Sequence, residues 1–429
     1  MGTFIDWLGE AFALVTPTDP LYSERSLAFN RLSCLNIIEN QKENYNFLQD
    51  LIRQLTQQAY VSHAVQGSCI QSMPLSAIET YGTAAAIVTF IDGNFSQADS
   101  YFDARGQAVQ LWKWADLPPE EQQAWLNDYQ ADLGSEEDLF VLLNHMLCQE
   151  IYFLKINDTV DLKDIIVIQN IITGSVPHIM PRLLLKVGAS SRVTIVEHNY
   201  VIDHTAHFIN ALTHVLLSAG AELSYYTLGH TPCYQVHTLH CNQKADSSLN
   251  HYVFSLGNVK LRMRFITQLN GKHATANLYG LYGLAAEEKV DYRVQIAHRY
   301  PQSFSKQHYK GIVGGQATAA FHGSIYVTPE AQQTNAYQTN NAIVLSPLAH
   351  HYVKPQLEIY ADDVKCSHGA TTGALDPTQL FYLQSRGIDA DLAKTILLEA
   401  FGKEIIDAVP IAELKQYISA KLLAKLAKL

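Results

Sequence analysis

The chain has 429 residues, of which 48% are hydrophobic and 17% are charged, and its formal net charge at pH 7 is −11. This length is enough for about two or three domains with a large core, and the composition is that of an ordered globular protein. The acidic balance argues against nucleic acid as a partner, and no apolar run approaches the roughly 18 residues of a membrane span, so we expect neither nucleic acid nor membrane as a partner.

Cysteine usage and the start of the chain indicate the compartment. The six cysteines have no Cys-x-x-Cys spacing and are too sparse for a disulfide framework. Arg25 is the first basic residue and follows Asp6 and Glu10, so the start lacks the basic segment of a secretory signal. Both observations predict a cytoplasmic protein.

Residues 1–150 are expected to form a mostly helical N-terminal region. Apolar residues recur at helical spacing over 4–12 and again over 47–55. The β-branched piece 86–90 interrupts this pattern and indicates a short strand.

Residues 151–373 change to a β pattern. Glycines separate many short β-branched or alternating runs, as at Gly188, Gly220 and Gly271. These runs are 165–172, 183–187, 193–196, 223–228, 252–256, 261–266, 290–296, 325–327 and 342–345. The pattern alone does not separate a β-sandwich from a stacked β-solenoid, although the length of the region and the irregular spacing lean toward the solenoid.

Residues 374–429 are expected to be helical. Asp376-Pro377 is typical of a helix start, and Arg386-Gly387 of a helix end. The last predicted helix carries an apolar stripe, formed by Leu414, Ile418, Leu422 and Leu426. Such a stripe either docks on a partner or packs on the chain's own core.

The segment 354–373 contains the strongest candidate for chemistry. It starts with strand-like alternation and continues to Cys366 and His368, which would share one face of a strand with Cα atoms about 6.6 Å apart. A thiolate and an imidazole suit zinc, copper or iron–sulfur chemistry, but two ligands leave a four-coordinate site incomplete. Lys365 could lower the pKa of the cysteine. The alternative is a small buried cysteine beside a hydrogen-bonded histidine.

Three pairs of histidines lie close together in the sequence. Two histidine pairs have i, i+3 spacing, but on a strand such residues point to opposite faces and do not chelate one ion. An adjacent histidine pair near a predicted turn is expected to lie on the surface. The pairs are His204 with His207, His237 with His240, and His350 with His351.

Three carboxylates suggest a second class of function. Glu358, Asp362 and Asp363 lie close together in the sequence, carboxylate pairs drive glycoside cleavage, and a β-solenoid that acts on carbohydrate is therefore the alternative hypothesis. No G-x-x-x-x-G-K-[ST] motif occurs, so we do not expect the chain to hydrolyse ATP by itself.

The run KPQLEIYADDVKCSHGAT, continued by LFYLQSRGID at 380–389, closely resembles the SufB/SufD family of iron–sulfur cluster assembly scaffolds, and within it the SufD type. Similarity covers most of the chain after about residue 140, whereas the first 130 residues match poorly. Weaker matches occur at Leu143-Asn144, Pro181-Arg182, Glu197, Tyr309-Lys310-Gly311 and 328–346.

The resemblance implies a fold and a complex. It implies that 151–373 form a right-handed parallel β-helix, and that 374–429 bind an ATPase subunit of the SufC type. It further implies a non-catalytic scaffold subunit that pairs with a SufB-like chain. A cluster would then assemble at the SufB–SufD interface, driven by ATP hydrolysis in SufC.

The resemblance also implies roles for single residues. The family's SufD interface histidine falls on His368, and the neighbouring cysteine on Cys366, which makes both candidate ligands of a transient iron–sulfur cluster. Asn340 occupies the place of an essential SufB cysteine. We therefore expect no tightly bound cofactor in the isolated chain. Because SufB and SufD share a fold, we also expect the isolated chain to form a homodimer through the surface from Asn340 to Cys366.

Overall fold

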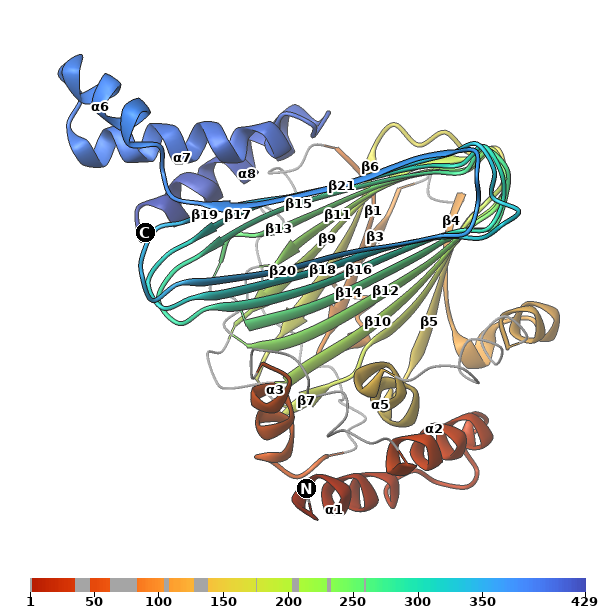
Figure 1. Cartoon of the computed structure of the whole chain (residues 1–429). Coiled ribbons are helices and arrows are strands. Elements are labelled where there is room, and N and C mark those ends of the chain that lie inside the picture. The colour runs from red at the N-terminus through yellow and green to blue at the C-terminus, as the bar shows by residue number, and fades with distance from the viewer. Residues whose placement is uncertain are drawn as a thin grey trace.

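Two long β-sheets face each other and form the body of the protein, with helices along the outside of both (Figure 1). The computed structural model describes residues 2–34, 47–61, 83–103, 108–126, 138–174, 176–202, 208–229, 233–257 and 260–429. Among these residues, no helix is long and apolar enough to cross a membrane.

The first sheet, sheet A, runs in the spatial order β2-β1-β6-β9-β11-β13-β15-β17-β19-β21, and β3 also pairs with β1. Its strands are β1 (Ala84–Ile91), β2 (Asn94–Phe95), β3 (Tyr101–Phe102), β6 (Ile165–Ile172), β9 (Arg192–Val201), β11 (Glu222–Gly229), β13 (Ser248–Ser255), β15 (Thr275–Leu284), β17 (Phe304–Val313), β19 (Thr334–Val344) and β21 (Val364–Gly373).

The second sheet, sheet B, runs in the order β20-β18-β16-β14-β12-β10-β8-β5-β4, and β7 also pairs with β10. Its strands are β4 (Val109–Lys113), β5 (Ile151–Ile156), β7 (His178–Ile179), β8 (Arg182–Val187), β10 (Phe208–Leu217), β12 (Tyr234–Gln243), β14 (Lys260–Leu269), β16 (Lys289–His298), β18 (Thr318–Val327) and β20 (His350–Ile359). Strands β1 to β4 precede residue 150, so the N-terminal region contributes to both sheets.

At the start of the chain, β2 and β3 pair antiparallel with β1, and β4 pairs antiparallel with β5. From β8 onward the chain alternates between the two sheets, and each strand up to β19 pairs in parallel with the strand one full coil later. Strand β13, for example, pairs with β15, which pairs with β17 in continuous register. The result is a parallel β-helix of about 7 turns with helices at both ends of the chain. This confirms the expected β-helix and decides between the two architectures that the sequence pattern left open.

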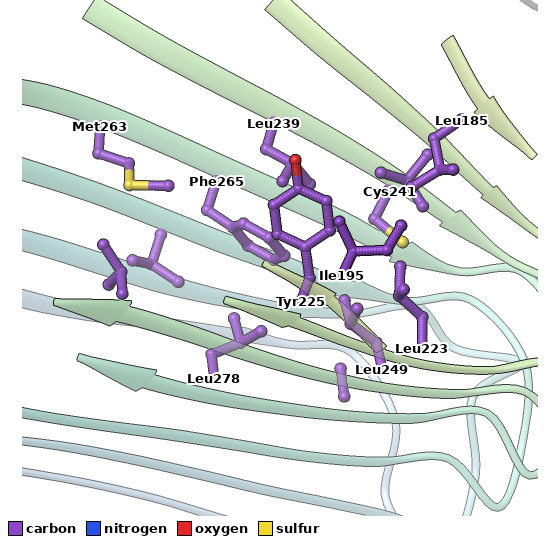
Figure 2. Close-up of a cluster of buried hydrophobic side chains, with 14 of the residues drawn as sticks. Leu185, Ile195, Leu223, Tyr225, Leu239, Cys241, Leu249, Met263, Phe265 and Leu278 are labelled. Atoms are coloured by element: carbon purple, nitrogen blue, oxygen red, sulfur yellow. The ribbon is translucent and has the colours of Figure 1, made fainter. Parts of the chain in front are cut away.

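Alternate residues of every strand point into the space between the sheets, which we call the bore. Figure 2 shows Leu239 and Phe265 from sheet B facing Tyr225, Leu249 and Leu278 from sheet A. All of these side chains are buried. Burying one leucine or phenylalanine is worth about 1.5–3 kcal/mol, so the stacked coils stabilise one another through this apolar filling.

Two glycine–tyrosine pairs inside the bore show how closely the coils fit. Gly280 is the register partner of Tyr309, and Tyr282 is the register partner of Gly311. A Cβ atom at either glycine would lie 2.1 Å from the ring of its partner. Each ring therefore occupies the space that a side chain on the neighbouring strand would need.

Gly280→Ala is expected to lower the free energy of unfolding by about 1–3 kcal/mol, because the Tyr309 ring must leave its position in a filled bore. Urea unfolding of the isolated chain measures the effect. Gly373→Ala is the matched control, since no atom lies within 4 Å of a Cβ built there. Equal stability of the two variants would contradict the tight fit.

The C-terminal helices are α6 (Pro377–Ser385), α7 (Ala390–Ile406) and α8 (Ala412–Leu426). Their starts follow local sequence, since the Asp376 and Asp389 side chains accept hydrogen bonds from the first backbone N–H groups of α6 and α7. Helices α7 and α8 pack on the outer face of sheet A (Figure 1).

The apolar stripe of α8 is buried in this contact, so it packs on the chain's own core instead of offering a docking surface. It meets Leu281 and Ile312 of the β-helix in one apolar cluster. The stripe residues Leu414, Ile418, Leu422 and Leu426 are at most 6% exposed. An amphipathic pattern identifies the buried face of a helix but does not identify what covers it.

Two ion pairs fasten the C-terminal helices to the coils beneath them. The Lys425 ammonium group of α8 lies 2.7 Å from a carboxylate oxygen of Glu288 and also donates to the backbone oxygen of Gly257. Lys310 of β17 pairs with Glu404 of α7. The side chains of Lys425 and Glu288 are only 2% and 12% exposed, so their contact is poorly screened by solvent, whereas the Glu404 side chain is 57% exposed and its pair with Lys310 is partly screened.

The remaining helices lie along sheet B. Among the described residues they include α1 (Gly2–Phe12), α2 (Tyr22–Cys34), α3 (Phe47–Thr56) and α5 (Leu139–Leu147), with a short 3₁₀ helix, η4 (Trp114–Asp116), and a helical stretch over 119–126. They share an apolar cluster with the outer face of sheet B. A buried guanidinium group fixes α2, because Arg25 donates to the backbone oxygens of Met146 and Cys148.

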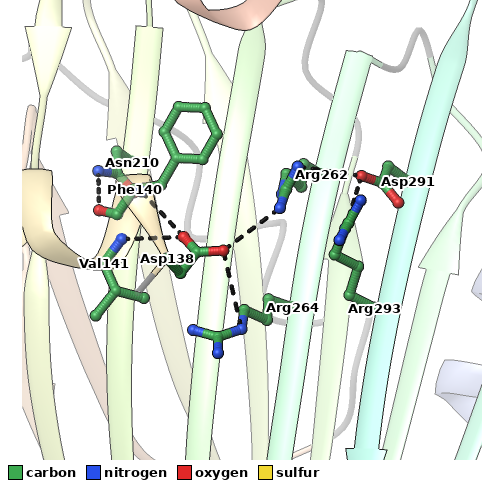
Figure 3. Close-up of polar contacts among 8 residues, drawn as sticks. All are labelled: Asp138, Phe140, Val141, Asn210, Arg262, Arg264, Asp291 and Arg293. Atoms are coloured by element: carbon green, nitrogen blue, oxygen red, sulfur yellow. Dashed lines mark hydrogen bonds and ion pairs between the residues drawn. The ribbon is translucent and has the colours of Figure 1, made fainter. Parts of the chain in front are cut away.

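A buried charge network joins α5 to sheet B (Figure 3). The Asp138 carboxylate caps α5 by accepting from two backbone N–H groups, and lies 3.4 Å from Arg262 and 3.9 Å from Arg264. Arg262 also approaches Asp291, to which Arg293 donates at 3.1 Å. Burial opposes ionisation of Asp138, but Arg264 and Arg262 together hold its pKa below the ordinary value.

Candidate functional site

The β-helix ends at an open rung formed by β20 and β21, the last strands of the two sheets. In β19, one coil earlier, the inward-facing residues Ala336, Gln338 and Asn340 are buried. Their register partners on β21 are half-buried or exposed, because no described segment covers this end. Edge strands with unpaired backbone groups are sites at which another chain can pair.

Cys366 and His368 lie on the inward-facing side of this open rung, as register partners of Ala336 and Gln338. The His368 side chain is exposed, whereas Cys366 is half-buried against a small apolar cluster that includes Ile325. Burial raises the pKa of the Cys366 thiol. The end of the bore thus presents an accessible imidazole and, two residues away, a mainly protonated thiol.

Lys365 does not lower the pKa of the cysteine thiol, which is the effect that the sequence suggested. Neighbouring residues of a strand point to opposite faces, so the exposed Lys365 side chain projects outward while Cys366 faces the bore. The shift of the cysteine pKa is upward, which is the opposite of what an ammonium group over the sulfur would produce.

His351 belongs to the same end of the bore, although the sequence pattern predicted a surface histidine. It is half-buried, with Nε2 3.0 Å from the Tyr282 hydroxyl and Nδ1 2.7 Å from the Thr372 hydroxyl. Burial lowers its pKa to about 4, so it is neutral near pH 7. Its alternation with Val353 was the signal that would have placed it on the inward face.

Asn340 lies just below the open rung and is buried. Its Nδ2 atom is 3.5 Å from the Tyr282 hydroxyl, which connects it to the His351 contacts. An amide is neither a thiolate nucleophile nor a soft metal ligand. This position therefore does not supply the sulfur chemistry that a cysteine would.

Carboxamides form a column directly beneath His368. Gln307, Gln338 and His368 are consecutive register partners on β17, β19 and β21, and both glutamines are almost fully buried. Both polar atoms of the Gln338 side chain and the Oε1 atom of Gln307 have no hydrogen-bond partner. Such atoms are costly in a protein interior, and a local pattern of residues does not reveal them.

The pair His237 and His240 does not form a metal site. His237 points into the bore, 3.9 Å from the Glu197 carboxylate, whereas His240 points outward, with its ring centre 5.1 Å from that of His214. The i, i+3 pair thus diverges as predicted. His204 and His207 lie outside the described residues.

The three carboxylates of the carbohydrate hypothesis do not converge. Glu358 lies on the outer side of β20 and accepts a hydrogen bond from Gln356 at 2.6 Å. Asp362 and Asp363 are exposed in the turn between β20 and β21. Glycoside cleavage needs two carboxylates that flank a bound sugar.

The described residues contain no group of three or more side chains able to hold a metal ion. The fold and its open rung define a parallel β-helix protein with an exposed imidazole and a half-buried thiol at an uncovered end. The family model "SUF system FeS cluster assembly, SufBD core domain" matches residues 170–401, more than half of the chain. The chain belongs to the SufB/SufD family and, within it, is most like SufD.

Three relatives illustrate the similarity. The iron-sulfur cluster assembly protein SufD of Escherichia coli is 35% identical over 240 residues, 56% of this chain and 57% of that protein. The SufBD family protein slr0076 of Synechocystis is 27% identical over 421 residues, 94% of this chain and 91% of that one. The chloroplastic protein ABCI7 of Arabidopsis thaliana is 32% identical over 239 residues, 55% of this chain and 50% of the plant protein.

The match spans just over half the length of the Escherichia coli protein and half of the plant protein. The family model covers the β-helix from β7 onward, the open rung, α6 and most of α7.

Proposed function

We propose that this chain is the non-catalytic scaffold subunit of a SufB–SufC–SufD-type complex, in which its open rung forms one half of the cluster-assembly site. One observation carries the proposal: the exposed His368 and the half-buried Cys366 share the uncovered end of the β-helix. A SufB-like chain seated there would complete the ligand set.

Iron and sulfide are the cargo of this site. An imidazole and a thiolate suit iron, but a cluster needs about four ligands, so the remaining ones come from the partner. Because the chain supplies an incomplete set, the cluster is transient at the interface and the isolated chain binds no cofactor tightly. Without its partner, the same uncovered end could accept a second copy of the chain, which would give a homodimer.

The energy for assembly must come from another subunit. The sequence has no phosphate-binding G-x-x-x-x-G-K-[ST] loop, so ATP hydrolysis falls to a SufC-like ATPase. We place its docking surface on α6 and the start of α7 instead of on α8. Helix α6 has no buried residue, and Phe381 and Tyr382 are 70% and 57% exposed. Exposed aromatic side chains of this size are typical anchors of an interface.

The double variant Phe381→Ala with Tyr382→Ala is expected to lose the ATPase subunit and to retain the SufB-like chain. Removing two aromatic anchors should weaken binding by about 2 kcal/mol or more for each, while folding is unaffected because both rings are exposed. Co-expression of the three chains, followed by affinity capture and determination of the mass, measures the outcome.

Tyr300→Ala, which removes an exposed tyrosine from a turn of the β-helix, is the control. Retention of the ATPase by the double variant would disprove the α6 surface. A wild-type chain that elutes alone would disprove the complex. Deleting 376–429 is a weaker test, because α7 and α8 cover the apolar face of sheet A.

A further inference from the structure

The order of donors and acceptors along the carboxamide column beneath His368 is set by a hydrogen bond at its far end. The Nε2 atom of Gln307 donates to the backbone oxygen of Ser324 at 3.5 Å. A backbone carbonyl only accepts, so Gln307 is oriented with its amide nitrogen toward that oxygen and its Oε1 atom free for a donor.

The next group in the column is suited to be that donor. Gln338 stands one strand nearer the open rung, and neighbouring strands are about 4.8 Å apart. Its Nε2 and Oε1 atoms are both unpartnered. If Nε2 donates to Gln307 Oε1, the Oε1 atom of Gln338 remains and requires a donor from the other side. The register partner on that side is His368.

The bore is built to hold this carboxamide. A Cβ atom at Gly323 of β18 would lie 1.6 Å from the Gln338 Nε2 atom. The Gln338 side chain therefore crosses the bore to sheet B and uses space that only a glycine leaves open. An apolar side chain of the same size would fill this space without unpaired polar atoms, which makes the presence of a glutamine costly for stability.

We propose that Gln338 is a positioning residue for His368. When a partner covers the open rung, rotation of the terminal amide groups closes a chain in which Gln338 donates to Gln307 and a ring N–H of His368 donates to Gln338. The second ring nitrogen of His368 then keeps its lone pair and faces the partner. This inference rests on the proposed function of His368 and specifies which tautomer performs it.

Gln338→Met tests the inference, since methionine preserves length and volume but removes both polar atoms. The variant is measured as the full chain co-expressed with SufB-like and SufC-like chains. Cluster yield is expected to fall about tenfold or more, as is usual when the group that orients a metal-binding histidine is removed. The thermal midpoint should not fall. The nitrogen NMR signals of the His368 ring are identified by their absence in His368→Ala. In Gln338→Met these signals should change from those of one tautomer to those of a mixture of both tautomers.

Tyr226→Phe is the control, because it also removes a buried polar atom that has no hydrogen-bond partner, but at a site beneath the C-terminal helices. In this variant the cluster yield and the tautomer of His368 should stay unchanged. An unchanged tautomer in Gln338→Met overturns the inference whatever the yield, and so does a mixture in the wild-type complex. If Gln338→Met does not fold, Gln307→Met breaks the same chain one step earlier, under the same criteria. Normal clusters in His368→Ala overturn the proposed function instead.

Discussion

His368→Ala is expected to abolish cluster formation by the complex while the chain still folds and binds its partners. The side chain is exposed at the open rung, so its removal leaves no cavity, and the free energy of unfolding should change by less than about 0.5 kcal/mol. An imidazole can ligate iron or carry a proton near neutral pH, and its loss should reduce the yield about 100-fold or more. Cluster absorbance, thermal midpoint and co-purification are measured together.

Two further variants sharpen this comparison. His350→Ala removes an exposed histidine from the same end of the β-helix and should leave cluster yield unchanged, because that side chain does not face the bore. Cys366→Ala should reduce the yield less than His368→Ala, since the thiol is half-buried and mainly protonated. If His368→Ala unfolds the chain or dissolves the complex, the residue is structural. If clusters form normally, the proposed role is wrong.

Acid is expected to destabilise the protein steeply below about pH 6.5, well before its carboxylates are neutralised. Burial lowers the pKa of His214, His251 and His298 to about 3, and that of His351 to about 4. In the unfolded chain these groups take up a proton near pH 6.5. Between these values the unfolded state binds more protons, so each histidine contributes stability that is complete above pH 6.5 and is lost as the pH falls.

For each buried histidine, the free energy of unfolding should be lower by roughly 2 kcal/mol at pH 5 than at pH 7. Urea titrations at the two pH values measure the total. His298→Gln isolates one contribution, because a carboxamide can still bond to Ser303 and Ser305, which lie 2.7 and 2.8 Å from the two ring nitrogens, but does not titrate. An identical pH dependence in this variant would show that His298 is not held neutral by the fold.

The sequence predicted features that depend on neighbouring residues. The α6 and α7 starts at Asp376 and Asp389 were predictable because a cap is a local contact. The run 223–228 lies within β11, and large apolar or aromatic side chains stand on both of its faces, with Leu223 and Tyr225 inward and Tyr226 and Leu228 outward. Strand β12 was not among the predicted runs, since its inward face includes Gln235 and His237, which interrupt the apolar alternation.

The candidate site was predictable only in part, for a related reason. Cys366 and His368 lie in one short motif, so their shared face followed from strand geometry. Gln338 and His351 act beside them only because the coils stack in a particular register, which brings together residues about one coil apart. No local pattern contains that register.

The fastening of α7 and α8 has a mechanical consequence. Lys310 links α7 to β17, and β17 is joined through β19 to β21, the strand that carries His368. Lys425 links α8 to the turn just before β16. A partner that bound α6 and rotated would therefore apply torque to the last coils, because α7 and α8 are held rigidly against them. The β-helix would move as a rigid body, and β21 at its open rung lies only two strands from β17, the strand to which α7 is attached.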